Sequence, residues 1–113
     1  LLGQALELYA ELGNEPRVLT SLEAVARLAA ASGRAAAGLS LFAASDLLRH
    51  GAGIPSSAGD RYARGRAVMT TRARLDVTTA DAAWSTGIGM TLEKAIANAA
   101  EQLASLMVPA DAR

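Results

Sequence analysis

Apolar residues return every three or four positions along most of this 113-residue chain, and short breaks containing Gly or Pro separate the runs. This spacing places the apolar side chains on one face of an α-helix, whereas a half-buried strand needs strict alternation. The composition agrees, because the 27 Ala and 16 Leu residues lead the ranking of helix propensity. The sequence contains no strand candidate of useful length. It therefore predicts an all-α domain.

The breaks divide the chain into about five longer helices and one short one. We expect the longer helices near 1–13, 14–33, 34–49, 60–75 and 92–107, and the short helix near 79–87. Asn14 and Thr91 suit N-cap positions, and either Ser57 or Asp60 suits the N-cap of the fourth long helix. The first two helices are joined by about two residues, which forces an antiparallel hairpin.

Several residues inside or between these helices predict how the helices pack. Gly38 lies within a helix, where glycine costs about 1 kcal/mol relative to alanine, so a close helix crossing is expected there. Ile54 lies in the 51–59 loop and is expected to return to the core. Gly87 and Gly89 are expected to end the short helix. Trp84 within that helix is expected to be a core residue rather than an anchor for a partner.

Charge and composition exclude several classes of site. Eleven Lys and Arg residues balance eleven Asp and Glu residues, so the net charge gives no reason to expect nucleic acid or a membrane surface as partner. The chain has no Cys, which excludes disulfides, thiol nucleophiles, Cys-ligated zinc and iron–sulfur clusters. His50 is the single histidine, so a His-rich metal site is excluded as well. We expect no cofactor and no metal.

Sequence patterns also predict the cellular location of the protein and the extent of the domain. The longest uncharged run of apolar appearance, Ala35–Ser45, has 11 residues, whereas a bilayer span needs about 20. The start shows no basic segment followed by an apolar one, so no signal peptide is expected and a cytoplasmic location is predicted. The chain begins with Leu1 rather than Met, which indicates a fragment of a longer protein. Residues 1–107 are expected to form the domain and 108–113 a tail.

Catalysis is not expected from these residues. A general base at His50 would need an orienting carboxylate and a nearby nucleophile. Asp46 lies four residues earlier on the same helix, but a cap at the helix C-terminus explains His50 more simply. The sequence therefore predicts a protein that is not an enzyme and has no catalytic residues.

The arginines of the 60–75 helix are the candidate interaction residues. Arg61, Arg64 and Arg72 share one helical face, which could meet phosphate or an acidic partner. A solvated, partly ion-paired face is the favoured alternative, because no aromatic residues interleave on that face of the helix. Nucleic-acid binding through the helix from Arg61 to Arg74 remains the alternative function. On the second helix, Glu23 and Arg27 are expected to form an ion pair one turn apart.

Two stretches resemble a bacterial protein family. The segment from Ala82 to Ile96 contains Trp-x-x-Gly-x-x-Met-Thr-Leu-Glu and is similar to a stretch near the end of large ATPase-type transcriptional regulators, the LuxR-type and MalT-like proteins. The stretch from Leu12 to Arg34 resembles a degenerate tetratricopeptide hairpin. The resemblance covers residues 5–106, and its Trp-containing motif is the more specific part.

The resemblance implies both a fold and a function. The fold would be antiparallel helical hairpins stacked as a tetratricopeptide-like right-handed array. The function would be non-catalytic protein–protein interaction or effector sensing within a transcriptional or signalling regulator. The partners would be other domains of the same regulator, a protein or a small effector, and a homodimer is also open. The chain has no G-x-x-x-x-G-K-[ST] loop and no recognisable helix-turn-helix, so nucleic acid would be bound only through a separate domain.

Overall fold

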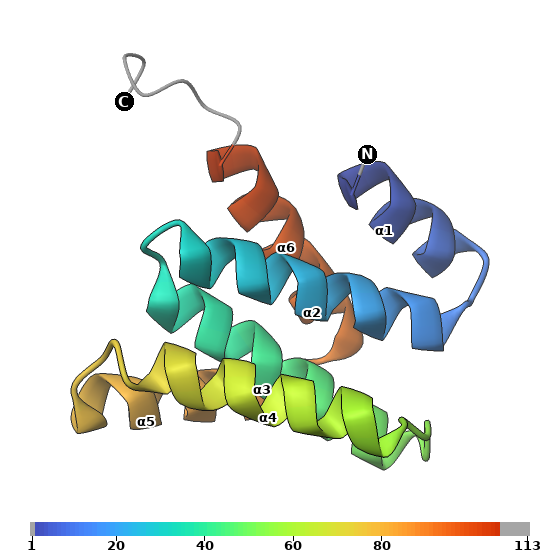
Figure 1. Cartoon of the computed structure of the whole chain (residues 1–113). Helices are drawn as coiled ribbons and strands as arrows, with labels where there is room; N and C mark the ends of the chain where they lie inside the picture. Colours follow the sequence, from blue (N-terminus) through green and yellow to red (C-terminus); the bar gives the residue numbers. More distant parts are fainter. Residues whose placement is uncertain (1, 107–113) are drawn as a thin grey trace.

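The helical spacing of the apolar residues produces six α-helices in the computed structural model, which describes residues 2–106 (Figure 1). The helices are α1 (Leu2–Glu11), α2 (Glu15–Ala31), α3 (Ala35–Gly51), α4 (Ala58–Arg72), α5 (Val77–Ile88) and α6 (Leu92–Leu106). No strand occurs in this part of the chain, so the all-α prediction is confirmed for it. The expected tail at 108–113 lies outside the described residues.

Three helices begin at the residues whose side chains suit a cap. Asn14 accepts a hydrogen bond from a first-turn N–H of α2 at 3.3 Å. Ser57 accepts one from the N–H of Asp60 at 3.0 Å, so Ser57 rather than Asp60 caps α4. Thr91 accepts one from the first turn of α6 at 3.2 Å. Each cap satisfies a backbone donor that has no partner inside its helix.

Helix α5 begins and ends differently from the prediction. Asp76 is its N-cap, because the Asp76 carboxylate accepts hydrogen bonds from both the backbone N–H and the hydroxyl of Thr79. The helix continues to Ile88 with Gly87 inside it, so the prediction that Gly87 ends this helix is wrong.

The cap of α5 gives a pH-dependent prediction. The Thr79 hydroxyl first, and then its backbone N–H, hold the pKa of Asp76 below its ordinary value. The cap's contribution to stability is therefore complete above the unfolded-state pKa and is lost as the pH falls through the folded-state pKa. In a carbon-13 NMR titration we expect a depressed pKa for the Asp76 carboxyl. Thr79→Ala should return that pKa towards its ordinary value, and an unchanged pKa would contradict the assignment of the cap.

Helix α3 lies at the centre of the packing. It packs against α2, α4, α5 and α6, while α1 packs mainly against α2. In Figure 1, α4 and α5 lie on one side of the α2–α3 pair, and α1 and α6 lie on the other. The largest fully buried apolar side chains are Leu6, Val18, Leu19, Leu22, Val25, Leu39, Leu41 and Phe42. Ile54 packs against this core, as predicted.

Two glycines permit the close crossings at α3. A Cβ at Gly38 would lie 2.7 Å from the carbonyl oxygen of Ala26 on α2, which confirms the crossing predicted from the sequence. A Cβ at Gly87 would overlap the carbonyl oxygen of Ser40 and lie 2.6 Å from the Cβ of Ala43. Gly87 therefore permits the close approach of α5 to α3.

The last helix returns to the first. Helix α6 packs against α2 and α3 and also contacts α1. In a linear repeat array each unit contacts only its sequence neighbours, so this contact is additional to simple stacking. The tetratricopeptide-like stacking of the hairpins stays a prediction.

Across residues 2–106, no helix combines the length and the apolar character that are required to cross a lipid bilayer.

Candidate binding site

A buried carboxylate joins three helices. Glu23 of α2 is only 6% exposed. One of its oxygens, Oε1, lies 3.3 Å from Nη2 of Arg49 on α3, and the other, Oε2, lies 3.4 Å from Nη1 of Arg64 on α4. The Ser45 hydroxyl of α3 donates a hydrogen bond to Oε2 at 3.1 Å. We call Glu23, Ser45, Arg49 and Arg64 the charged cluster.

Helical spacing brings the members of the charged cluster together. Glu23 follows Leu19 by four residues and precedes Ala26 by three, and both of these neighbours are fully buried. Glu23 therefore lies on the inward face of α2. Ser45 and Arg49 are also four residues apart, so they project from the same face of α3 towards Glu23.

The positive charge in this cluster exceeds the negative charge. Two guanidinium groups share one carboxylate, and the Nε atom of Arg49 is buried without an acceptor among residues 2–106. Arg64 uses its Nη2 atom to donate a hydrogen bond to the Ser56 hydroxyl at 3.1 Å. Buried polar atoms normally have hydrogen-bond partners, so the free Nε of Arg49 marks an incomplete arrangement.

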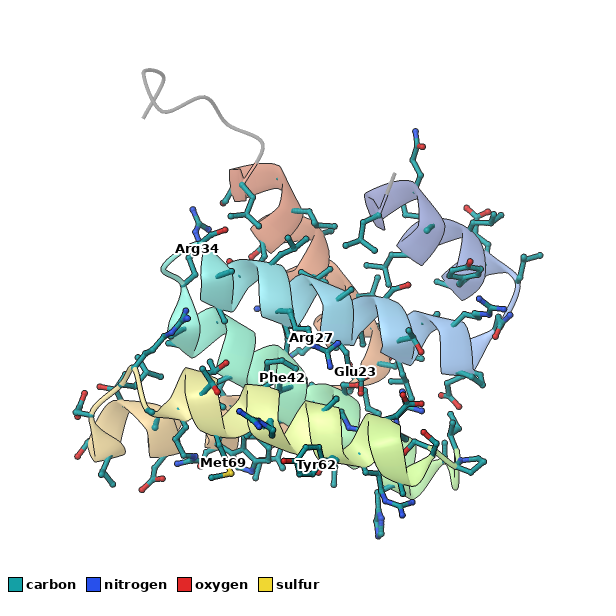
Figure 2. The ribbon with its side chains drawn as sticks, in the orientation of Figure 1. Glu23, Arg27, Arg34, Phe42, Tyr62 and Met69 are labelled. Atoms are coloured by element: carbon teal, nitrogen blue, oxygen red, sulfur yellow. The ribbon has the colours of Figure 1, made fainter. Side chains whose placement is uncertain are left out.

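A cleft of about 350 Å³ opens over the charged cluster. Its charged lining comprises Glu23, Arg27, Asp60 and the two cluster arginines, and Pro16, Ile54 and Pro55 contribute apolar surface. Figure 2 shows Glu23 and Arg27 projecting from α2 into the region between α2 and α4. The volume falls within the range of about 300–1,000 Å³ that is typical of small-molecule sites.

The donors in this arrangement are suited to binding an anion. The hydroxyl beside the carboxylate belongs to Ser45, whose side chain is fully buried. A substrate entering the cleft could not reach that oxygen. The arginines, in contrast, supply planar sets of N–H donors that recognise carboxylates or phosphates.

The three candidate interaction residues on α4 each contact a different part of the fold. Arg64 belongs to the charged cluster, with a side chain only 12% exposed. Arg61 donates a hydrogen bond to the carbonyl oxygen of Ser56 at 2.9 Å. Arg72 pairs with Asp81 at 2.9 Å, and its guanidinium lies 5.7 Å from the ring centroid of Trp84. The structure does not gather the three guanidinium groups into one free basic surface.

Other charged and aromatic residues also have partners inside the fold. Arg27, the expected partner of Glu23, lies over the ring of Phe42 instead, at 5.9 Å from the ring centroid. Arg74 donates a hydrogen bond to the carbonyl oxygen of Ala30. Trp84 is partly buried and packs against the core that contains Phe42 and against a smaller buried group of Leu39, Ala80 and Ala83.

Sequence reasoning predicted none of the four members of the charged cluster in its actual role: Glu23 was paired with Arg27, Arg64 was named only as a candidate interaction residue, and Ser45 and Arg49 were given no part in a site. The spacing of Glu23 from Leu19 and Ala26 carried a signal, because it places a carboxylate on the apolar face of α2. Arg49 gave no comparable signal, since an arginine in the last turn of a helix is also explained by the helix dipole.

No protein-family model, curated protein or solved structure shows a significant match to this chain. The resemblance to LuxR-type and MalT-like regulators therefore rests on the residues quoted for it alone.

Proposed function

We propose that this chain is a non-catalytic, effector-sensing helical module, in which a small effector enters the cleft and acts on α4. The observation that carries the proposal is the way α4 is attached. Thr71 is the one buried residue of α4, while α2 and α3 each bury many. The ion pair between Arg64 and Glu23 joins α4 to α2 at the wall of the cleft.

This attachment gives α4 the properties of a responsive element. Regions with few buried apolar contacts open at a lower free-energy cost than the core. A ligand that contacts α4 and the core together favours the closed position of α4, by as much as its affinity differs between the two positions. Binding can therefore be converted into a change at the surface of α4, where Tyr62 and Met69 are exposed on the side away from α2 (Figure 2).

The setting of the module is proposed from the resemblance. The Trp84–Glu93 motif supports a transcriptional or signalling regulator of the LuxR or MalT type, located in the cytoplasm. The α1–α2 and α3–α4 hairpins would stack in the tetratricopeptide-like manner, with α6 covering the end of the stack. The position of α4 would be recognised by other domains of the same regulator, by another protein or by a second copy of the chain.

Direct nucleic-acid binding by α4 is the less supported alternative. Arg61, Arg64, Arg72 and Arg74 all have hydrogen-bond or ion-pair partners within the fold. Carboxylates compensate the charges of Arg64 and Arg72, and the guanidinium groups of Arg61 and Arg74 already donate to backbone carbonyls. A mixed-sequence duplex in low salt should show no binding by fluorescence anisotropy. Binding that weakens steeply with salt would support the alternative.

Hydrogen exchange measured by NMR tests the sensing proposal. We expect the amides of α4 to exchange through a partial opening, while those of α2 and α3 exchange only through global unfolding. Glu23→Gln should accelerate exchange in α4. Asp81→Asn is the matched control, because it removes the exposed pair with Arg72 and should leave the opening of α4 unchanged.

The same measurement can be repeated with a panel of organic acids, amines, sugars and nucleotides. At least one compound should slow exchange in α4 relative to α1. Uniform protection of α4 and the core, or no response to any compound, would contradict effector sensing.

A further inference from the structure

We infer that the cleft binds a small organic monocarboxylate, with its carboxylate between Arg49 and Arg64 and its short apolar part against Ile54 and Pro55. The inference rests on the proposed function and specifies the chemical class of the effector. Nothing in the resemblance to regulators requires this class.

The first argument is the unsatisfied arginine. The side chain of Arg49 is 10% exposed, and it lines the cleft while its Nε has no acceptor in the described chain. A buried donor without an acceptor costs about 1–3 kcal/mol. The Nε itself is too deeply buried for a ligand in the cleft to touch, so it shows that Glu23 leaves Arg49 incompletely paired. An anion at the cleft side of this guanidinium would compensate the positive charge that Glu23 leaves.

The second argument is the length of the existing ion pairs. The distances of 3.3 and 3.4 Å from Glu23 to Arg49 and Arg64 exceed the distances of about 2.7–2.9 Å found in strong charge-assisted hydrogen bonds. Each guanidinium meets Glu23 through a single nitrogen. Both arginines therefore retain donor capacity for a second carboxylate, and Glu23 can remain in place.

The third argument is the number of charges around the cleft. Arg27, Arg49 and Arg64 are opposed by Glu23 and Asp60, so three positive charges face two negative ones. One carboxylate brings the cleft to neutrality, whereas a phosphate dianion would leave it with an excess negative charge beside Glu23 and Asp60. A cation would add to the excess that is already present.

The fourth argument is the apolar part of the lining. Pro16, Ile54 and Pro55 provide walls with no charge, and Ile54 is held by its packing on the core. Such walls can pack against a short hydrocarbon chain, whereas an anion without an apolar part would gain nothing from them. The structure therefore favours an organic acid over an inorganic anion.

NMR titration with butyrate tests this inference, with butyramide as the neutral analogue of the same shape. We expect saturable shifts of the Nε–H signals of Arg49 and Arg64 with butyrate, and at least tenfold weaker binding of butyramide. Inorganic phosphate should bind at least tenfold more weakly than butyrate. Equal binding of butyrate and butyramide, tighter binding of phosphate or no saturable shift would each overturn the inference.

Several variants test whether butyrate binds in this cleft, so that the test does not depend on a single substitution that could disturb folding. Arg49→Gln should weaken butyrate binding at least tenfold. Because that change can also disturb folding around Glu23, Arg27→Gln provides a second test at an exposed position of the lining, with an expected loss of about threefold. Arg66→Gln is the matched control, since Arg66 lies over Tyr62 and outside the lining. Loss of binding in the Arg66 variant equal to that in the Arg27 variant would overturn the location.

The inference and the proposed function fail in different ways. If butyrate binds and α4 exchange does not change, the ligand class stands and sensing through α4 fails. If butyrate does not bind while an amine, sugar or nucleotide slows exchange in α4, the ligand class fails and sensing stands.

Discussion

Replacing Glu23 with alanine should lower the free energy of unfolding by about 3–5 kcal/mol. The substitution leaves Arg49 and Arg64 mostly buried without their counter-charge, and it removes the nearer of the two acceptors of the Ser45 hydroxyl. A domain of this size has a total stability of about 5–15 kcal/mol, so the loss is a large share of the total. Urea denaturation followed by circular dichroism at low temperature measures it.

Two further variants separate a broken ion pair from a general loss of packing. The triple variant Glu23→Leu, Arg49→Met and Arg64→Met removes all three charges and should recover most of the stability lost in Glu23→Ala, because buried ion pairs are often replaceable by apolar residues. Asp81→Asn breaks the exposed pair with Arg72 and should change stability by less than about 1 kcal/mol. A loss in Glu23→Ala as small as in Asp81→Asn would show that Glu23 does not hold the three helices together.

Replacing Gly87 with alanine should lower the free energy of unfolding by about 2–3 kcal/mol. The added methyl would meet the carbonyl oxygen of Ser40, which is backbone and cannot rotate away. The α3 and α5 helices would have to separate, which would also strain the 2.9 Å hydrogen bond from the Ser40 hydroxyl to the carbonyl oxygen of Ala83. Thermal unfolding followed by circular dichroism measures the loss.

Gly65→Ala is the matched control for this substitution. Gly65 also lies inside a helix, but a Cβ there would have no neighbour within 4 Å. Alanine should therefore raise stability by about 0.5–1 kcal/mol through its higher helix propensity. A gain at both glycines would show that α5 does not approach α3 as closely as the structure indicates.

The sequence by itself determined the local structure of this protein. Apolar spacing located the six helices, and short polar side chains at Asn14, Ser57 and Thr91 marked where three of them begin. These features depend on residues within one or two turns of each other, so they can be recognised without knowledge of the fold. Gly38 was recognisable for a related reason, since a costly glycine inside a helix needs a compensating contact.

Only the tertiary structure decided which distant residues meet. Glu23 was assigned to a pair within its own helix, yet it binds arginines from two other helices. Gly87 was read as a helix end, because the carbonyl oxygen it has to avoid belongs to a residue 47 positions earlier in the sequence, Ser40. The contact between α6 and α1 likewise joins residues that lie far apart in the sequence. Helical periodicity states which face of a helix is buried, but the identity of the opposing face depends on how all the helices fill the core together.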